Sequence, residues 1–138
     1  MSTLTPEVDI ATVLHTAIPA LVVGTSIKYG PPRSPTEPGN DAVKIWISPY
    51  IETGDPLTNA AVEGALYETR VQLTVLSPPD DYATGLVLAR QVRDAITFHA
   101  SAGYAGWYLL NGPNLVAPNE AMQQRWTVNI KAVWKAVP

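Results

Sequence analysis

The stretch Leu66–Ala100, LYETRVQLTVLSPPDDYATGLVLARQVRDAITFHA, decides the fold. In its first third, Val71, Leu73 and Val75 alternate with polar residues. An alternation with a period of two, rich in β-branched residues, is typical of a strand that buries one face. We therefore predict a strand over residues 66–76.

A proline corner and an amphipathic helix follow this strand. Pro78 and Pro79 lack the backbone donors that a sheet or a helix interior needs, and Asp80 or Asp81 can cap the helix that comes next. Apolar residues then recur three or four positions apart, which indicates a helix with one buried face. The predicted stripe consists of Ala83, Leu86, Ala89, Val92 and Ile96, flanked by the cations Arg90 and Arg93.

The remaining elements are predicted as partners for this strand and helix. Thr5-Pro6-Glu7 offers a hydroxyl cap and a proline at the first helical position, so a first helix should start there and end before Pro19. Strands are predicted over residues 21–28 (in which Gly24 can mark a bulge), 43–48, 106–110 and 125–135, with a turn at 111–114. Together they predict a single domain, residues 1–138, with an α+β fold: one mostly antiparallel sheet of about four to five strands packed against two helices.

Two long connections separate the predicted strands. Residues 29–41 hold four prolines and two glycines, so this loop should stay exposed, and its restricted backbone would lower the ordering cost of docking on a partner. A passive connector is the alternative interpretation. Residues 49–65 form the second connection, which we interpret as the tip of a long hairpin; strand pairing can extend into it.

Composition limits the classes of protein that fit. The chain has 138 residues, a net charge of −3 and no cysteine, which excludes disulfides and gives no basic footprint for tight nucleic-acid binding. Only 15% of the residues are charged, which fits either a surface covered by other chains or an ordinary domain of low charge. The sequence shows no signal peptide and no apolar run of about 20 residues, so a soluble protein made in a cytoplasm is expected.

No motif for catalysis, cofactor binding or metal binding stands out. His15 and His99 have no second ligand or carboxylate at motif spacing, and helix capping accounts for the adjacent pair Asp80-Asp81. The glycines form no phosphate-binding loop. The four tryptophans and six tyrosines lack interleaved basic residues, so we interpret them as sheet core and interface anchors. We therefore predict no catalytic residue, no cofactor and no metal ligand.

Several stretches resemble the tail terminator proteins of long-tailed bacteriophages, also called tail completion or minor capsid proteins. The resemblance covers residues 7–135 and is centred on 67–97. It rests on the strand YETRVQLTVLS, the helix DDYATGLVLARQVRDAI and the last strand QRWTVNIKAVW. The corner Ser77-Pro78-Pro79 departs from it, because many members have a shorter corner with a charged residue there.

The resemblance implies a structural virion protein, not an enzyme. It implies a homohexameric ring at the head-proximal end of the tail tube, which stops tube polymerisation and offers a docking face to the head. The implied partners are further copies of the chain, the major tail tube protein, the head–tail connector, and genomic DNA that passes through the lumen without specific binding; no membrane is involved. The implied location is the neck of the virion, after assembly in the host cytoplasm.

We expect the two long connections and the cationic side of the central helix to contact neighbouring subunits or the tube. Arg90 and Arg93, near Asp94, are alternatively a solvated flank of the helix. Two other functions stay open, a head-completion or connector protein of the neck and a small cellular ligand-binding or enzyme domain. The candidate interface residues are Arg33, Glu37, Glu52, Asp55, Leu57, Glu63, Arg90 and Arg93.

Overall fold

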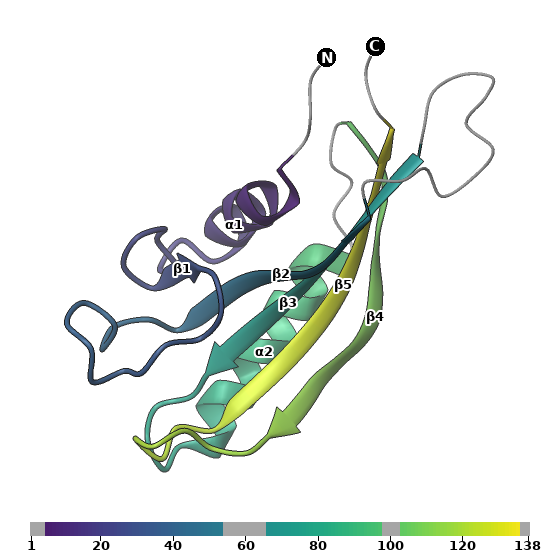
Figure 1. Ribbon diagram of the computed structural model, residues 1–138. Coiled ribbons are helices and arrows are strands. Elements are labelled where there is room, and N and C mark those ends of the chain that lie inside the picture. Colours follow the sequence, from purple (N-terminus) through teal and green to yellow (C-terminus); the bar gives the residue numbers. More distant parts are fainter. Residues whose placement is uncertain (1–4, 54–65, 98–102, 136–138) are drawn as a thin grey trace.

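The computed structural model describes residues 5–53, 66–97 and 103–135 (Figure 1). It contains two helices and a five-stranded sheet, which confirms the predicted α+β fold. The elements are α1 (Pro6–Ala17), β1 (Ile27–Tyr29), β2 (Ile45–Thr53), β3 (Leu66–Leu76), α2 (Tyr82–Thr97), β4 (Tyr104–Val116) and β5 (Arg125–Lys135).

The five strands form one sheet in the order β1-β2-β3-β5-β4. β1 runs parallel to β2, whereas every other neighbouring pair is antiparallel. β3 and β5 pair without interruption from Leu66 opposite Lys135 to Leu76 opposite Arg125. The strand within the opening stretch is therefore the centre of the sheet.

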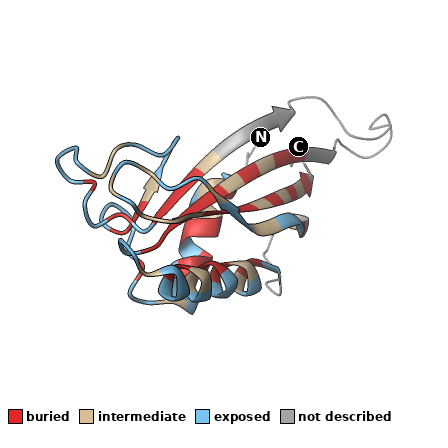
Figure 2. Cartoon of the chain, turned by 90° about the horizontal axis from the view of Figure 1, so that it is seen from below, coloured by how far each residue is buried: buried red, intermediate tan, exposed pale blue. Residues whose placement is uncertain are grey.

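Both helices pack on one face of the sheet, and the main core lies between these two layers (Figure 2). Val71 and Ile130 face each other in this core, as do Leu73 and Val128. Five alternate apolar residues of β5 are buried, as expected for a strand with one inward face: Trp126, Val128, Ile130, Ala132 and Trp134. A smaller cluster of Val43, Trp46 and Leu76 is buried apart from the main core.

The predicted stripe of α2 needs one correction at its N-terminal end. Ala83 is exposed and Gly85 is buried in its place, because Gly85 lies against the corner at Ser77. Asp81, not Asp80, caps the helix: its carboxylate accepts hydrogen bonds from the backbone N–H and the hydroxyl of Thr84, which also lower the pKa of Asp81.

Two predicted strands have wrong boundaries near the edges of the sheet. Residues 21–28 are mostly a turn, because the Ser26 hydroxyl accepts a hydrogen bond from the Val22 N–H at 2.7 Å and only Ile27–Tyr29 pairs with β2. The predicted turn at 111–114 lies inside β4, which continues to Val116 through irregular pairing with β5. Proline is tolerated in such an edge strand, so Pro113 does not end it.

Candidate assembly surfaces

Lys28 and Asn40 fix the connection between β1 and β2 to the sheet. This connection includes the proline-rich loop predicted over 29–41. The Lys28 ammonium donates to the Gly39 carbonyl at 2.7 Å and to the Asn40 side-chain oxygen at 2.9 Å. Asn40 is buried and donates to the Ser34 carbonyl and the Glu37 carboxylate. The loop is thus anchored from within.

Arg33 and Glu37, the two predicted contact residues of this loop, both have exposed side chains. The Ser34 hydroxyl between them donates to the carboxylate of Glu120, which precedes β5. This bond ties the loop to the connection between β4 and β5. Arg33 and Glu37 are therefore displayed on a loop that is held at both its base and its side.

The hairpin of β2 and β3 carries the second predicted surface. Strand pairing continues to Thr53, opposite Glu68, so the connection predicted over 49–65 begins later than the sequence indicated. Glu52 lies in the last part of β2, opposite Thr69. The other predicted contact residues of this connection, Asp55, Leu57 and Glu63, lie outside the described residues.

The two predicted cations of α2 differ in their surroundings. Arg90 is exposed, whereas the Arg93 guanidinium pairs with the neighbouring Asp94 carboxylate at 2.9 Å. Across the part of the chain that the structure describes, no ion pair joins either arginine to Glu37 of the loop. The structure thus leaves the loop and the helix as separate surfaces within one subunit.

The face of the sheet opposite the helices carries a row of amide side chains that the sequence analysis did not identify. The Gln72 amide donates to the Asn129 side-chain oxygen at 3.1 Å, and the Asn129 amide donates to that of Asn111 at 2.6 Å. The Asn114 amide donates to the same Asn111 oxygen, also at 2.6 Å. The alternating patterns of the strands place Gln72 and Asn129 on the face away from the core, whereas Asn111 and Asn114 were predicted to lie in a turn.

A compact group of charges continues this amide row. The Glu68 carboxylate lies 2.6 Å from the Arg70 guanidinium and 4.0 Å from the Lys131 ammonium. Lys131 also lies 5.4 Å from the centre of the Tyr108 ring. The two cations flank one carboxylate, so the group has a formal net charge of +1.

A partly buried hydrogen bond connects the first helix to the sheet. The Tyr104 hydroxyl at the start of β4 donates to the Asp9 carboxylate of α1. Burial, together with this bond and the negative charges of Asp9 and Glu7, raises the pKa of Tyr104 well above its ordinary value. Tyr104 therefore stays protonated, and the bond fixes the start of β4 against α1.

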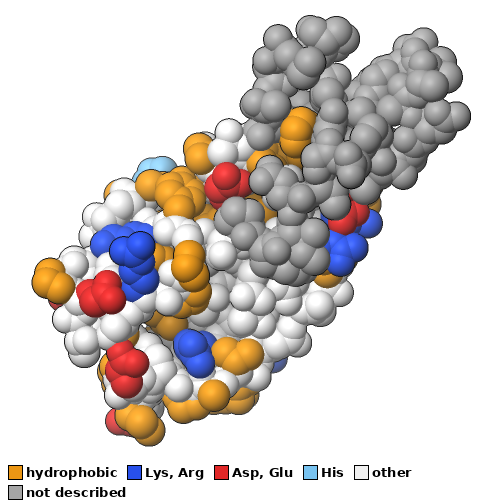
Figure 3. All heavy atoms as spheres, viewed as in Figure 1, with side chains coloured by type: hydrophobic (Ala, Val, Ile, Leu, Met, Phe, Trp, Pro, Cys, Tyr) orange, Lys and Arg blue, Asp and Glu red, His pale blue; other side chains and the backbone are white. Residues whose placement is uncertain are grey.

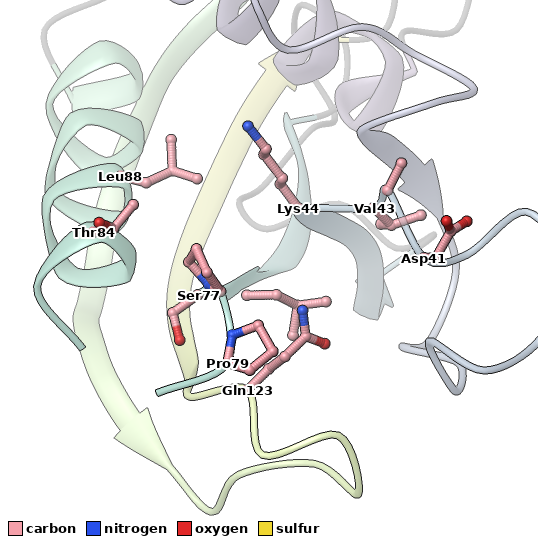
Figure 4. A pocket seen from close by; sticks show the side chains of 11 residues that line it. Asp41, Val43, Lys44, Ser77, Pro79, Thr84, Leu88 and Gln123 are labelled. Carbon is pink, nitrogen blue, oxygen red and sulfur yellow. The ribbon is translucent and has the colours of Figure 1, made fainter. Parts of the chain in front are cut away.

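A hollow of about 360 Å³ lies between the start of β2, the proline corner and α2 (Figure 4). Leu88 and Thr84 line it from α2, and Lys44 lines it from the residue before β2. Asp41 is the one carboxylate among the described residues that line it, so this part of the structure offers no pair of acidic groups for acid–base chemistry. The lining residues are Asp41, Ala42, Val43, Lys44, Leu76, Ser77, Pro78, Pro79, Thr84, Leu88 and Gln123.

The described residues also provide no other recognisable chemical centre. Within residues 5–53, 66–97 and 103–135, no three His, Asp or Glu side chains are grouped so that they could hold a metal ion. His15 is exposed, and its Nδ1 lies 2.6 Å from the Leu21 carbonyl oxygen. His99 lies outside the described part of the chain. No helix in that part is long and apolar enough to cross a membrane.

The fold defines the chain as an α+β protein with two helices on one face of a five-stranded sheet. No family model matches its sequence, and no curated protein sequence matches it either. Among solved structures, the chain is similar to a chain of the virion of a native gene transfer agent particle. The match has a TM-score of 0.54 and 19% sequence identity, and it covers 95% of this chain and 90% of the other. At this identity the similarity shows a shared fold.

Proposed function

We propose that the chain is a structural virion protein that closes the head-proximal end of a phage-type tail tube. In this proposal, six copies form a ring that stops tube polymerisation and then offers a docking surface to the head connector. The observation that carries the proposal is the fold shared, over nearly the full length of both chains, with a component of a gene transfer agent virion. The tail-terminator pattern of the strand and helix in residues 67–97 supports the same function.

The positions of the two long connections fit a protein with two different partners. In Figure 1, the connection between β1 and β2 lies near one end of the strands, and the ends of β2 and β3 at Thr53 and Leu66 lie at the other. One side of a terminator must bind the tube through the same contacts that tube subunits make with each other. Its other side must not bind a further ring of tube subunits. Because the two connections lie at opposite ends of the sheet, each can contact a different partner.

The charge of the chain is compatible with a lumen through which DNA moves. The net charge is −3, and a mildly acidic wall repels phosphates weakly and does not retain them. The amide row on the helix-free face adds neutral groups that are hydrogen-bonded to one another. In the proposed ring, neither feature provides a strong binding site for the passing DNA.

Deleting residues 54–63 is expected to leave the fold intact and to prevent tail termination. The β2–β3 pairing from Thr53 opposite Glu68 onward supports the sheet without these residues, whereas the proposal assigns the tip to the contact with tube or neighbour. We expect tubes that are longer than normal and carry no heads in electron micrographs of lysates from cells that make the deletion variant as their only copy.

Two controls sharpen this experiment. The deletion variant should keep the far-ultraviolet circular dichroism and melting temperature of the wild type, and a Gly/Ser segment of equal length in place of 54–63 should give the same tail defect. Normal-length tails with unattached heads would instead indicate the head-completion or connector function. Normal, fully assembled particles from both variants would refute the assignment of the tip.

A further inference from the structure

The β4 edge of the sheet is apolar and carries no charged residue. Residues 104–116 include no Asp, Glu, Lys or Arg. Four of their large apolar side chains are between 36% and 50% exposed. These side chains, which we call the β4 edge, are Tyr108, Leu109, Leu110 and Leu115.

This edge has irregular pairing and one proline, but it lacks the charged residues that often keep sheets from associating. Natural edge strands are protected by lysines, prolines, bulges or a covering segment. The register of β4 against β5 shifts between Tyr104 and Gly106 and at two places between Leu109 and Asn114, a stretch that includes Pro113. Between these shifts, Tyr108 and Leu109 pair with β5 on one side and have no strand on the other among the residues that the structure describes. This part of β4 is therefore available to a strand of a partner.

The opposite edge of the same sheet is largely apolar as well. It is formed by β1 and the turn before it, where Val22, Val23 and Tyr29 are 45%, 46% and 41% exposed. Residues 21–27 contain no charged side chain, and the ammonium group of Lys28 in β1 is hydrogen-bonded to the loop at Gly39 and Asn40. We call these three residues the β1 edge. Figure 3 shows exposed hydrophobic groups, interspersed with charged side chains, over the described part of this view.

The strand directions make the two edges suitable for each other. β4 is antiparallel to β5, which is antiparallel to β3, and β3 is antiparallel to β2. β4 therefore runs opposite to β2 and also to β1, which is parallel to β2. A second copy placed beside the first in the same orientation brings its β1 edge to the β4 edge in the antiparallel sense.

We propose that the β4 edge of one copy docks against the β1 edge of the next copy. This inference rests on the proposed ring and names the subunit contact within it. Because the two edges belong to opposite sides of one sheet, the contact is head-to-tail, and its repetition around an axis yields a closed ring. The helices then form one wall of the ring and the amide-bearing face forms the other.

Lysine substitutions on each edge test this contact. Leu110→Lys changes the β4 edge and Val23→Lys changes the β1 edge; Leu115→Lys is a second β4-edge variant at a side chain that is 50% exposed. Val87→Lys on α2, at a side chain that is 53% exposed and off both edges, is the matched control. Each variant is first compared with the wild type by melting temperature, so that a folding defect is recognised.

Native mass spectrometry then measures assembly. We expect a ring from the wild type and from Val87→Lys, and monomers from each edge variant, with an apparent dissociation constant raised at least about 100-fold by the unpaired buried charge. An equimolar mixture of Leu110→Lys and Val23→Lys is expected to form dimers and nothing larger. Each such dimer uses the one intact β1 edge and the one intact β4 edge of the pair.

Other outcomes overturn the contact. Assembly of Val23→Lys as in the wild type, with loss of assembly in Leu110→Lys and Leu115→Lys, would indicate a symmetric contact between two β4 edges. Assembly by all variants, or a monomeric wild type at every concentration, would refute the edge contact altogether.

The result is separable from the proposed function. If the edge variants lose the ring but give tails of normal length, the edge contact is supported and the proposed role in tail termination is refuted. If the edge variants keep the ring while deletion of 54–63 gives overlong tails, the role in tail termination is supported and the edge contact is refuted.

Discussion

Replacing Gly85 by alanine is expected to destabilise the protein by about 1–3 kcal/mol, although the same change in an exposed helix interior stabilises by about 1 kcal/mol. A Cβ atom at this position would lie 2.3 Å from the Ser77 Cβ and 3.0 Å from the Ser77 Cα. It would also lie 3.1 Å from the indole nitrogen of Trp126. Because Ser77 belongs to the proline corner, the collision pushes α2 away from the end of β3.

The measurement is urea unfolding followed by circular dichroism. Gln91→Ala, at an exposed position of the same helix, is the control and should change the free energy of unfolding by less than about 0.5 kcal/mol. Ser77→Gly removes the colliding Cβ, so the double variant should lose less stability than the sum of the two single variants. A Gly85→Ala variant as stable as the wild type would show that the helix does not approach the corner this closely.

Gly112→Ala is expected to cost about 2–6 kcal/mol, the sum of two independent effects of about 1–3 kcal/mol each. Gly112 has a φ of +114°, which L side chains rarely adopt. A Cβ atom there would lie 2.5 Å from the Thr127 carbonyl oxygen and 2.9 Å from the Val128 Cα. Both atoms belong to the backbone of β5 in the middle of the sheet, so neither can move aside cheaply.

Gly30→Ala separates the two effects, because Gly30 has a similar φ of +104° but nothing within 4 Å of the added Cβ. It should show the cost of the backbone conformation alone. The additional loss of stability in Gly112→Ala, measured by the same urea unfolding, is then the cost of collision with β5. Equal losses in the two variants would contradict the close approach of β4 to β5 at this point.

The sequence predicted the parts of the fold whose pattern is set by one buried face. β3 and β5 alternate over their full length and lie in the centre of the sheet, so their boundaries and inward residues follow directly from the pattern. α2 follows from its spacing and its cap. Gly85 was missed because its burial depends on how closely the helix meets Ser77, which spacing along one element does not encode.

The edges of the sheet were harder to predict. The apolar run at residues 21–23 satisfies a strand pattern, but a hydrogen bond from the Val22 N–H to the Ser26 hydroxyl holds it in a turn. Residues 111–114 have the composition of a turn, yet an edge strand accepts glycine and proline with irregular pairing.

Some features of the candidate surfaces could be predicted from the sequence, and others could not. The exposure of Arg33 and Glu37 follows from a loop composition that cannot pair in a sheet. The Lys28–Asn40 anchor of that loop and the amide row across β3, β5 and β4 depend on contacts between residues far apart in the sequence. The apolar character of the two sheet edges became visible only once the strand order was known.

We propose that the chain works as a closed ring at the end of a tail tube. Native mass spectrometry combined with negative-stain imaging of the purified wild-type protein, alone and mixed with the tail tube protein, is the decisive experiment. We expect a six-fold ring with a central opening, bound to the end of each tube. A compact monomer at every concentration, with or without tubes, would contradict it.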